Sequence, residues 1–188
     1  EVQFLLPGFL REAGIELPMY FDQGMYSWNH LAGAAMERYG ADRLTIPVEL
    51  NEREIRDSGV QGEMIVYGYL PMMISAQCIR KTTLGCSGKP EIMWLKDRKD
   101  MRFPVVNQCR FCYNTIYNSA PLSLLGLSEQ VTGLKPNAVR LNFTVEEPAA
   151  AGEILDAFFE EYGMSEKAAE PPVLRNQFTR GHFKRGVE

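Results

Sequence analysis

The four cysteines of this chain are confined to one short segment, and this constrains the fold more than any other feature of the sequence. They are Cys78, Cys86, Cys109 and Cys112, in a chain of 188 residues. Disulfide scaffolds are small, secreted and dense in cysteine, and this chain is none of these. Unrelated core cysteines would not gather beside a closing Cys-x-x-Cys pair. Both of these readings stay open, but the clustering favours four thiolates that converge on one inorganic centre.

The spacing of the cysteines suits a metal or cluster site. The pair Cys109 and Cys112 lets two sulfurs reach one centre from a tight turn, while Cys78 and Cys86 approach from a separate loop. Four thiolates bind zinc tetrahedrally or hold an iron–sulfur cluster. The first interval, Cys-x₇-Cys, is unlike the short knuckles of a zinc ribbon. It therefore favours a [4Fe–4S] cluster, with zinc as the alternative.

The charge around the cysteines is opposite in sign to that of the chain. Between Cys78 and Cys112 there are eight basic and three acidic residues, a net charge of +5, whereas the whole chain carries −4. Cationic neighbours lower the pKa of a thiol and favour the thiolate that binds metal. The same segment can meet an anionic partner. A solvated basic loop explains the charge equally well.

The length and composition indicate an ordinary globular protein. A chain of 188 residues can bury one core, or it can be part of a larger domain. No apolar run approaches the roughly 20 residues of a membrane span, so we expect no membrane partner. The first residues are neither an initiator Met nor a signal sequence. We therefore expect a fragment of a cytoplasmic protein with reduced thiols.

Alternating strand and helix signals predict an α/β fold. Strands are expected at residues 17–22, 43–48, 63–69 and 138–145, and helices at 28–39, 51–59, 121–134 and 148–162; residues 4–7 resemble the end of an earlier strand. Short connections between such elements predict parallel strands with helical crossovers. A β-hairpin at residues 90–106 separates the two cysteine pairs. Four βα units cannot close an eight-stranded barrel, so the pattern predicts an open sheet or half of a barrel.

These signals divide the chain into two parts. Residues 1–163 are expected to form the partial barrel, with residues 71–113 as a cysteine-containing insertion. Residues 164–188 are polar, then basic, and predict a linker followed by a basic C-terminal segment.

In parallel α/β folds, ligands bind at the carboxyl ends of strands. This rule nominates Asp22, Glu49, Tyr69 and Thr144. Glu49 can orient a substrate or act as a base, or it can be an ion-paired residue before a helix. Asp22 is a catalytic candidate whose simpler explanation is a turn.

The C-terminal segment supplies further candidates. His182 lies between Gly181 and Gly186 and is flanked by Arg180 and Arg185, a pattern that can approach an anionic group or form a flexible basic tail. Asn114, two residues after the last cysteine, can line the same cavity as the cysteines. The sequence has neither a Gly-x-Ser-x-Gly elbow nor a His-Glu-x-x-His helix, so it offers no independent support for a hydrolase.

Three separate motifs resemble one known family. They are YGYLPMMISAQC at residues 67–78, CRFCYN at 109–114 and TRGHFKRGV at 179–187. In this order they resemble the collagenase-like peptidases, peptidase family U-thirty-two. The resemblance implies that the chain is the second half of a TIM-like (β/α)₈ barrel. The missing N-terminal half is then a partner within the same protein.

The resemblance also implies a function. Relatives include proteins needed to hydroxylate bases of ribosomal and transfer RNA, and several hold a [4Fe–4S] cluster with cysteines. By this likeness Cys78, Cys86, Cys109 and Cys112 are cluster ligands; Tyr69, Asn114, Arg180 and Arg185 are expected to contact substrate, with RNA as a partner. The family name implies a peptidase as a second hypothesis. A third hypothesis is a non-enzymatic, zinc-stabilised domain that binds RNA or protein.

Overall fold

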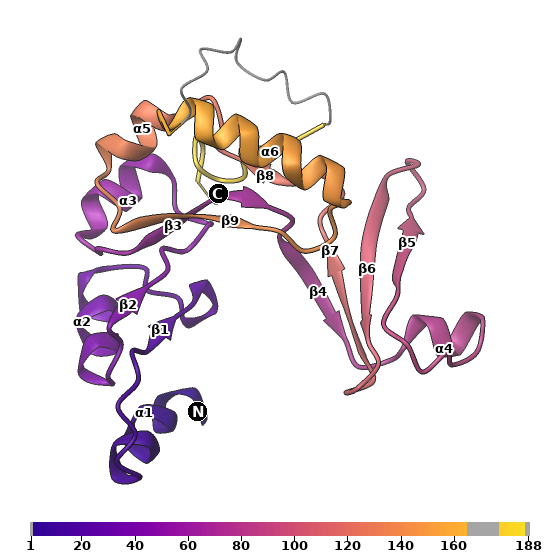
Figure 1. Ribbon diagram of the computed structural model, residues 1–188, viewed down its shortest axis with the longest axis horizontal. Coiled ribbons are helices and arrows are strands. Elements are labelled where there is room, and N and C mark those ends of the chain that lie inside the picture. Colours follow the sequence, from indigo (N-terminus) through magenta and orange to yellow (C-terminus); the bar gives the residue numbers. More distant parts are fainter. Residues whose placement is uncertain (1, 165–176, 187–188) are drawn as a thin grey trace. The chain divides into compact units, whose positions relative to one another are not determined.

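The computed structural model describes residues 2–164 and 177–186 (Figure 1). The elements in chain order are α1 (Val2–Glu12), β1 (Tyr20–Phe21), the short 3₁₀ helix η1 (Gln23–Met25), α2 (His30–Arg38), β2 (Arg43–Leu44), α3 (Glu52–Ser58), β3 (Glu63–Gly68), β4 (Pro71–Ser75), α4 (Ile79–Thr83), β5 (Ile92–Lys96), β6 (Arg102–Gln108), β7 (Tyr113–Tyr117), β8 (Leu122–Ser123), α5 (Ser128–Gly133), β9 (Ala138–Asn142) and α6 (Pro148–Glu161).

The chain folds into two compact units that do not follow sequence order. Unit 1 comprises residues 1–66, 127–141 and 180–188, and unit 2 comprises residues 67–126 and 142–179. The division falls within β3 and within β9. The cysteine segment, residues 71–113, lies wholly in unit 2, whereas the C-terminal residues from 180 onward belong to unit 1.

Unit 1 contains the parallel βα units that the sequence predicts. β1 pairs with β2 in parallel, and a parallel bridge between Thr45 and Glu63 joins the next strand. Phe21 and Leu44 point to one side of this sheet and pack with Met36 of α2 and with Val60. Alternation along the strands places their polar neighbours on the opposite side.

The helix α3 illustrates how local sequence sets an element of unit 1. Its N-cap Asn51 accepts a hydrogen bond from the backbone of Glu54, and the Glu54 side chain accepts one from the Asn51 backbone. This reciprocal capping box satisfies two backbone donors at the helix start. Gly59 ends the helix in the left-handed conformation, which glycine adopts without steric cost. The helix predicted at residues 51–59 is therefore confirmed, with Asn51 and Gly59 as its two caps.

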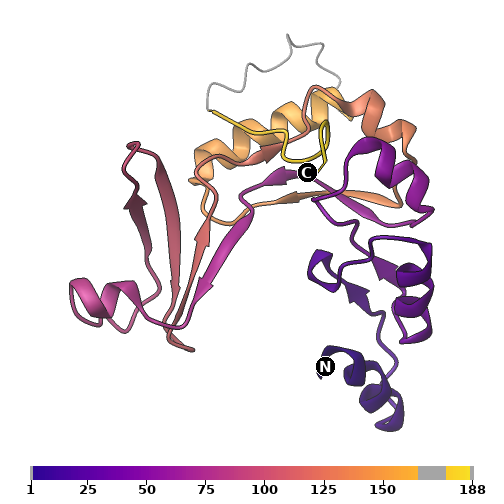
Figure 2. The ribbon, with the colours of Figure 1, turned by 180° about the vertical axis from the view of Figure 1, so that it is seen from behind.

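Unit 2 is built around an antiparallel sheet with strand order β4-β7-β6-β5. The predicted hairpin forms β5 and β6, and β7 and β4 extend it, with α4 at the end where β4 finishes (Figures 1 and 2). The helix α6 lies along β8 and buries Ile154, Ala157 and Phe158, which are spaced for one helical face.

Several predicted elements are wrong in detail. Residues 4–7 belong to α1, because Leu5, Leu6, Phe9 and Leu10 recur at helical spacing. The helix expected at residues 121–134 begins only at Ser128, since Leu122 and Ser123 pair with β3 in antiparallel fashion. The helix expected at residues 28–39 begins at His30 with Asn29 as its N-cap, and the buried hydroxyl of Ser27 donates to the carbonyl of Thr45.

The fold class is therefore mixed α/β. Strands in the described part of the chain form the sheets β1-β2, β8-β3-β9 and β4-β7-β6-β5, and none closes into a barrel. Residues 165–176, where the linker is expected, lie outside the described residues. No helix in residues 2–164 or 177–186 has the length and apolar character needed to cross a bilayer.

Candidate functional site

The second cysteine pair occupies the turn between β6 and β7. Cys109 and Cys112 follow the last residue of β6 and precede the first of β7. Cys112 adopts a left-handed backbone with φ 54°, which closes the turn, and its thiol donates to the Cys109 carbonyl at 3.8 Å. The Cys109 thiol donates to the carbonyl of Lys89 at 2.9 Å. This tight turn therefore presents two sulfurs from neighbouring positions, as the Cys-x-x-Cys spacing predicts.

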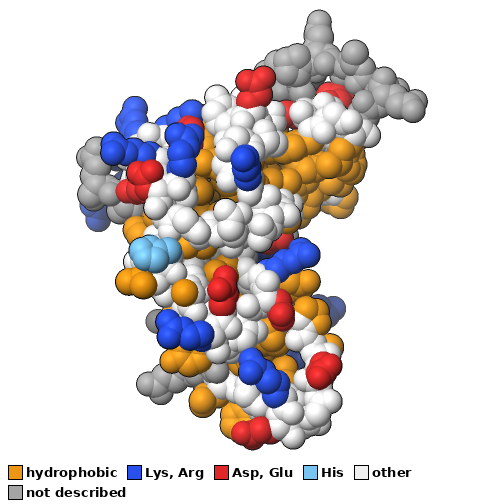
Figure 3. All heavy atoms as spheres, turned by 90° about the vertical axis from the view of Figure 1, so that its left-hand side faces the viewer, with side chains coloured by type: hydrophobic (Ala, Val, Ile, Leu, Met, Phe, Trp, Pro, Cys, Tyr) orange, Lys and Arg blue, Asp and Glu red, His pale blue; other side chains and the backbone are white. Residues whose placement is uncertain are grey.

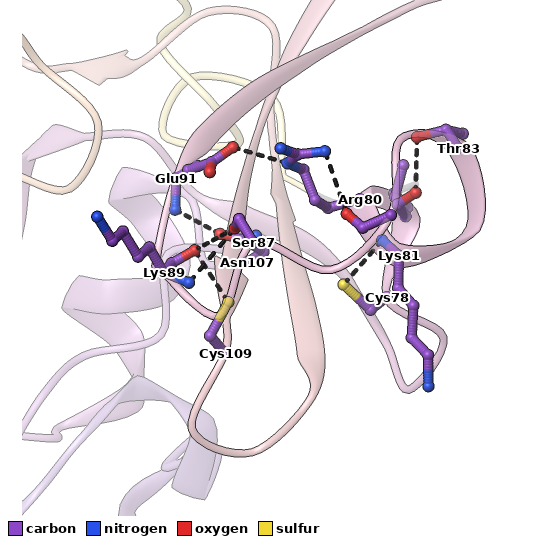
Figure 4. A network of polar contacts seen from close by, with 11 residues as sticks. Cys78, Arg80, Lys81, Thr83, Ser87, Lys89, Glu91, Asn107 and Cys109 are labelled. Atoms are coloured by element: carbon purple, nitrogen blue, oxygen red, sulfur yellow. Dashed lines mark hydrogen bonds and ion pairs between the residues drawn. The ribbon is translucent and has the colours of Figure 1, made fainter.

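The first pair comes from α4 and the loop that follows it. Cys78 is the N-cap of α4, and its sulfur accepts a hydrogen bond from the Lys81 backbone at 3.4 Å. Cys86 lies in the exposed loop between Gly85 and Gly88, both with positive φ. Figure 4 shows the Cys78 sulfur on the α4 side and the Cys109 sulfur beside the loop that carries Lys89. All four cysteines are free thiols, so the structure contains no disulfide between them.

Two buried asparagines hold the loops that carry the cysteines. Asn107 and Asn114 lie directly opposite each other on β6 and β7 and are almost completely buried. The Asn114 amide donates to the carbonyl of Gln77 at 2.6 Å, just before Cys78. The Asn107 side-chain oxygen Oδ1 accepts a hydrogen bond from the backbone N–H of Glu91, which ends the loop after Cys86. Asn114, expected to contact substrate, therefore reaches the main chain instead of solvent.

The electrostatics of Cys109 differ from the expectation of a lowered thiol pKa. Partial burial raises the pKa of Cys109, and the nearby thiols Cys86, Cys78 and Cys112 raise it further. Arg80 does not offset this, because it pairs with Glu91 at 2.9 Å and also donates to the carbonyl of Gly85. The basic residues of the segment thus fail to lower this pKa. All three other sulfurs are nevertheless near enough to act on Cys109.

The donor set matches the chemistry of zinc or of an iron–sulfur cluster. It consists of four sulfurs, the softest ligands that proteins offer. Among the described residues, no group of three or more Cys, His, Asp or Glu side chains is already arranged to hold a metal ion. Binding of a metal by all four sulfurs therefore requires the cysteines to move closer together. Gly85 and Gly88 have open space around them and can supply that movement in the loop.

A second polar site lies in unit 1, on the side of the parallel strands opposite the apolar core. Arg140 of β9 donates to Asp22 at 2.7 Å and to the Thr45 hydroxyl at 2.8 Å. Its Nε lies 2.7 Å from a Glu63 oxygen, although this ion pair is not aligned as a hydrogen bond. These residues line a cavity of about 450 Å³ together with Arg43. Asp22, a predicted catalytic residue, is thus an ion-paired residue at a strand end.

Replacing Arg140 by Met is expected to lower the free energy of unfolding by roughly 1–2 kcal/mol at neutral pH, because two carboxylates lose their charged partner. Burial alone would raise the pKa of Asp22, but hydrogen bonds from Arg140 and from the Gln23 backbone outweigh it and lower that pKa. A carboxyl group whose pKa is lowered by folding contributes stability above its ordinary pKa and loses it on acidification. The difference between the two proteins should therefore shrink below about pH 4.

Urea unfolding at several pH values measures this effect. The control is Arg53→Met, which breaks an exposed pair with Asp57 on α3. Exposed pairs of this kind contribute less than about 0.5 kcal/mol. Equal losses for Arg140→Met and Arg53→Met at neutral pH would show that the Arg140 network is not a stabilising element of unit 1.

A carboxylate in unit 2 was not recognised from the sequence. Glu146 accepts hydrogen bonds from the backbone of Thr144 and Val145, at 2.6 and 3.0 Å, while its other oxygen is buried without a hydrogen-bond partner among the described residues. Burial and then the Glu146 charge raise the pKa of Tyr67 and of Tyr69. Both phenols therefore stay protonated and can donate hydrogen bonds. The sequence did point to this place in the chain, because Thr144, a candidate at a predicted strand end, is two residues before Glu146.

The remaining candidates, in the turn before α3 and in the C-terminal segment, all belong to unit 1. Glu49 lies in the turn between β2 and α3 and makes no ion pair with a described residue. His182 Nδ1 is 2.8 Å from the Gly186 carbonyl, inside a turn where the Phe183 carbonyl accepts from the Glu52 backbone. Arg180 is half-buried and Arg185 exposed in this C-terminal segment of unit 1. Figure 3 shows acidic, basic and hydrophobic side chains interspersed on the face that includes α1 and α2.

Scans against protein-family models, characterised proteins and solved structures find no match to this chain. The resemblance to the collagenase-like peptidases therefore rests on its three motifs. The residues of two of them, 67–78 and 109–114, lie together in unit 2, and most of the third belongs to unit 1.

Proposed function

We propose that this chain belongs to an iron–sulfur protein that acts in the hydroxylation of RNA bases, with Cys78, Cys86, Cys109 and Cys112 as ligands of a [4Fe–4S] cluster. The observation that carries the proposal is a set of four free thiols on two loops of one compact unit, three of which raise the pKa of the fourth, Cys109. Its place within a TIM-like barrel, completed by an N-terminal half, belongs to the same proposal.

The ligand chemistry supports a cluster. No carboxylate or imidazole is needed to complete the set, because four cysteines suffice for an iron–sulfur cluster. Bound iron would reverse the raised pKa of Cys109, since a coordinating thiol loses its proton outright. The hydrogen bonds of the Asn107 and Asn114 side chains fix the main chain beside the cysteine loops. The loops are thus anchored at the points from which they would close around a cluster.

The proposed reaction favours iron over zinc. Replacing a ring C–H by C–OH removes two electrons from the base, and a cluster of iron can carry electrons whereas zinc has no redox chemistry. The oxygen donor and the terminal electron acceptor are further reactants that the full protein must engage. A zinc-stabilised binding domain accounts for the same four thiols, but it provides no electron carrier.

The test is mass spectrometry of nucleosides from RNA of cells that make the full-length protein, compared with cells that make only its Cys109→Ser variant. We expect at least one hydroxylated nucleoside to disappear in the variant. Identical nucleoside profiles would contradict the proposed reaction. Peptide hydrolysis that survives Cys→Ser replacement at all four positions would instead support a peptidase.

A further inference from the structure

One face of the four-stranded sheet in unit 2 carries exposed apolar side chains. In the antiparallel register Trp94 lies opposite Pro104, and the row Ile92, Val106, Thr115 and Ile74 crosses all four strands. Directly opposed residues share a face, and so do residues two apart. On this face Ile74 is 70 % exposed, Trp94 55 % and Ile92 47 %. We call it the Trp94 face.

Cations gather at one end of the Trp94 face. Lys96 and Arg102 are the next opposed pair of β5 and β6 on this face, two positions beyond Trp94 and Pro104. Arg98 and Lys99 occupy the turn that joins these strands. The acidic residues of this turn are already engaged: Asp97 accepts from the backbone of Lys99 and Met101, and Asp100 pairs with Lys96 at 2.7 Å. Arg98, Lys99 and Arg102 make no ion pair within the described part of the chain, so their charge faces solvent.

Aromatic rings lie at the other end of the same face. Tyr113 is opposite Gln108, which places it on the Trp94 side of the sheet. Phe111 stacks with Tyr113 at 6.3 Å and is 67 % exposed, and the Arg110 guanidinium lies 5.4 Å from the Phe111 ring. Pro104, opposite Trp94, and Gln108, opposite Tyr113, are four positions apart on β6, which corresponds to about 13 Å. Each end thus combines an aromatic ring with a nearby guanidinium or ammonium group.

We propose that the Trp94 face binds single-stranded RNA, with bases stacked on Trp94 and on Phe111 and the backbone along Arg98, Lys99 and Arg102. Exposed aromatic rings on a sheet provide stacking platforms for unpaired bases, and cations beside them bind the phosphates. The choice of RNA over DNA rests on the proposed function. Phe111 lies between Cys109 and Cys112, so an RNA strand that stacks on Phe111 would reach the proposed cluster.

The charge pattern distinguishes this occupant from a protein partner. A protein-binding patch typically has a polar rim around an apolar core. Here the acidic side chains near the face are engaged in the turn and in the Lys96 pair. The unpaired groups at the rim are therefore cations only, within the described residues. A polyanion that also presents flat rings satisfies the cations and the exposed indole together.

Fluorescence anisotropy of a labelled decauridylate tests the proposal with the intact protein. Each stacked base contributes about 1–3 kcal/mol, so Trp94→Ala should weaken binding by about 5- to 150-fold. Trp94→Phe should restore most of the affinity, because it keeps a ring. Trp28→Ala is the matched control, since Trp28 is 40 % exposed but lies in unit 1; its affinity should equal that of wild type.

A second variant tests the charges independently of the indole. Arg102→Ala should reduce the slope of log affinity against log salt by about 0.7, the value for one phosphate contact on a single strand, whereas Arg53→Ala on α3 should not. Thermal melting of each variant shows whether it is folded, and Arg102→Ala keeps the test valid if Trp94→Ala does not fold. Absence of binding in about 50 mM salt, or equal affinities of Trp94→Ala and Trp28→Ala, would overturn the proposal. A Trp94-dependent dimer without RNA affinity would also overturn it.

The metal content of the same samples separates this inference from the proposed function. Trp94-dependent binding by protein that contains no iron supports the Trp94 face and contradicts the cluster. Protein that contains a complete cluster but fails to bind decauridylate supports the cluster and contradicts RNA binding by the Trp94 face.

Discussion

Replacing Cys109 by Ser is expected to remove the bound metal and to lower the free energy of unfolding by several kcal/mol. Metal binding at structural thiolate sites is worth about 10–16 kcal/mol in small domains, and loss of one ligand forfeits much of it. Cys109 is the best placed of the four for this test, because all three other thiols act on it and its thiol contacts the Lys89 carbonyl. The loop between Cys86 and Glu91 should lose order together with the metal.

Metal analysis and thermal melting of anaerobically purified protein measure both effects. Thr83→Ser on α4 is the control, because it makes a similarly small change nearby and keeps the hydroxyl that donates to Ile79. It should retain full metal content and the wild-type melting temperature. Retention of metal by Cys109→Ser, with no change in melting temperature, would show that this sulfur is not a ligand.

Replacing Asn114 by Ala is expected to have the second-largest effect, a loss of about 2–3 kcal/mol in the free energy of unfolding. Asn114 is fully buried, so its removal leaves the Gln77 carbonyl without its donor in a site with little access to water. The displaced Gln77 segment leads directly into Cys78. Metal affinity should therefore fall by about 10- to 100-fold, as it does when groups that orient ligands are lost.

Asn114→Asp separates the hydrogen bond from side-chain size. It keeps the volume but places a carboxylate opposite the Gln77 carbonyl, so it should destabilise the protein at least as much as Asn114→Ala. Asn118→Ala is the control: this half-buried asparagine caps the neighbouring Ser119 backbone, and its loss should cost about 1 kcal/mol or less with unchanged metal affinity. If Asn114→Ala were no worse than Asn118→Ala, the asparagine would not hold the cysteine loop.

The elements that the sequence predicts correctly are those with local signals. Asn51 and Glu54 form a capping box, and Gly59 ends the same helix, so sequence neighbours alone determine α3. The hairpin of β5 and β6 and the helix α6 likewise follow from apolar spacing within each segment. These elements form as predicted because the signals that determine them come from residues close in sequence.

Elements that depend on distant partners could not be predicted. Leu122 and Ser123 carry no distinct strand pattern, yet they pair with Tyr67 and Gly68, more than fifty residues earlier in the chain. Pairing with β7 likewise makes a second strand of residues 71–75, beyond the strand predicted at residues 63–69. Tertiary hydrogen bonding outweighs local preference in both cases.

The candidate sites show the same limit. The cysteines are recognisable from residue type and spacing, but the roles of Asn107 and Arg140 depend on which strands become neighbours. Sequence composition also led to the wrong direction for the pKa of Cys109. The count of cations could not reveal that Arg80 pairs with Glu91 or that three other thiols raise the pKa of Cys109.

Quantification of iron, acid-labile sulfide and zinc in the anaerobically purified protein tests the central claim most directly. If the four thiols hold a cubane cluster, each chain should contain about four iron and four sulfide ions, with little zinc. About one zinc ion per folded chain, without iron or sulfide, would contradict the cluster, and a folded protein free of all metals would contradict any shared metal centre.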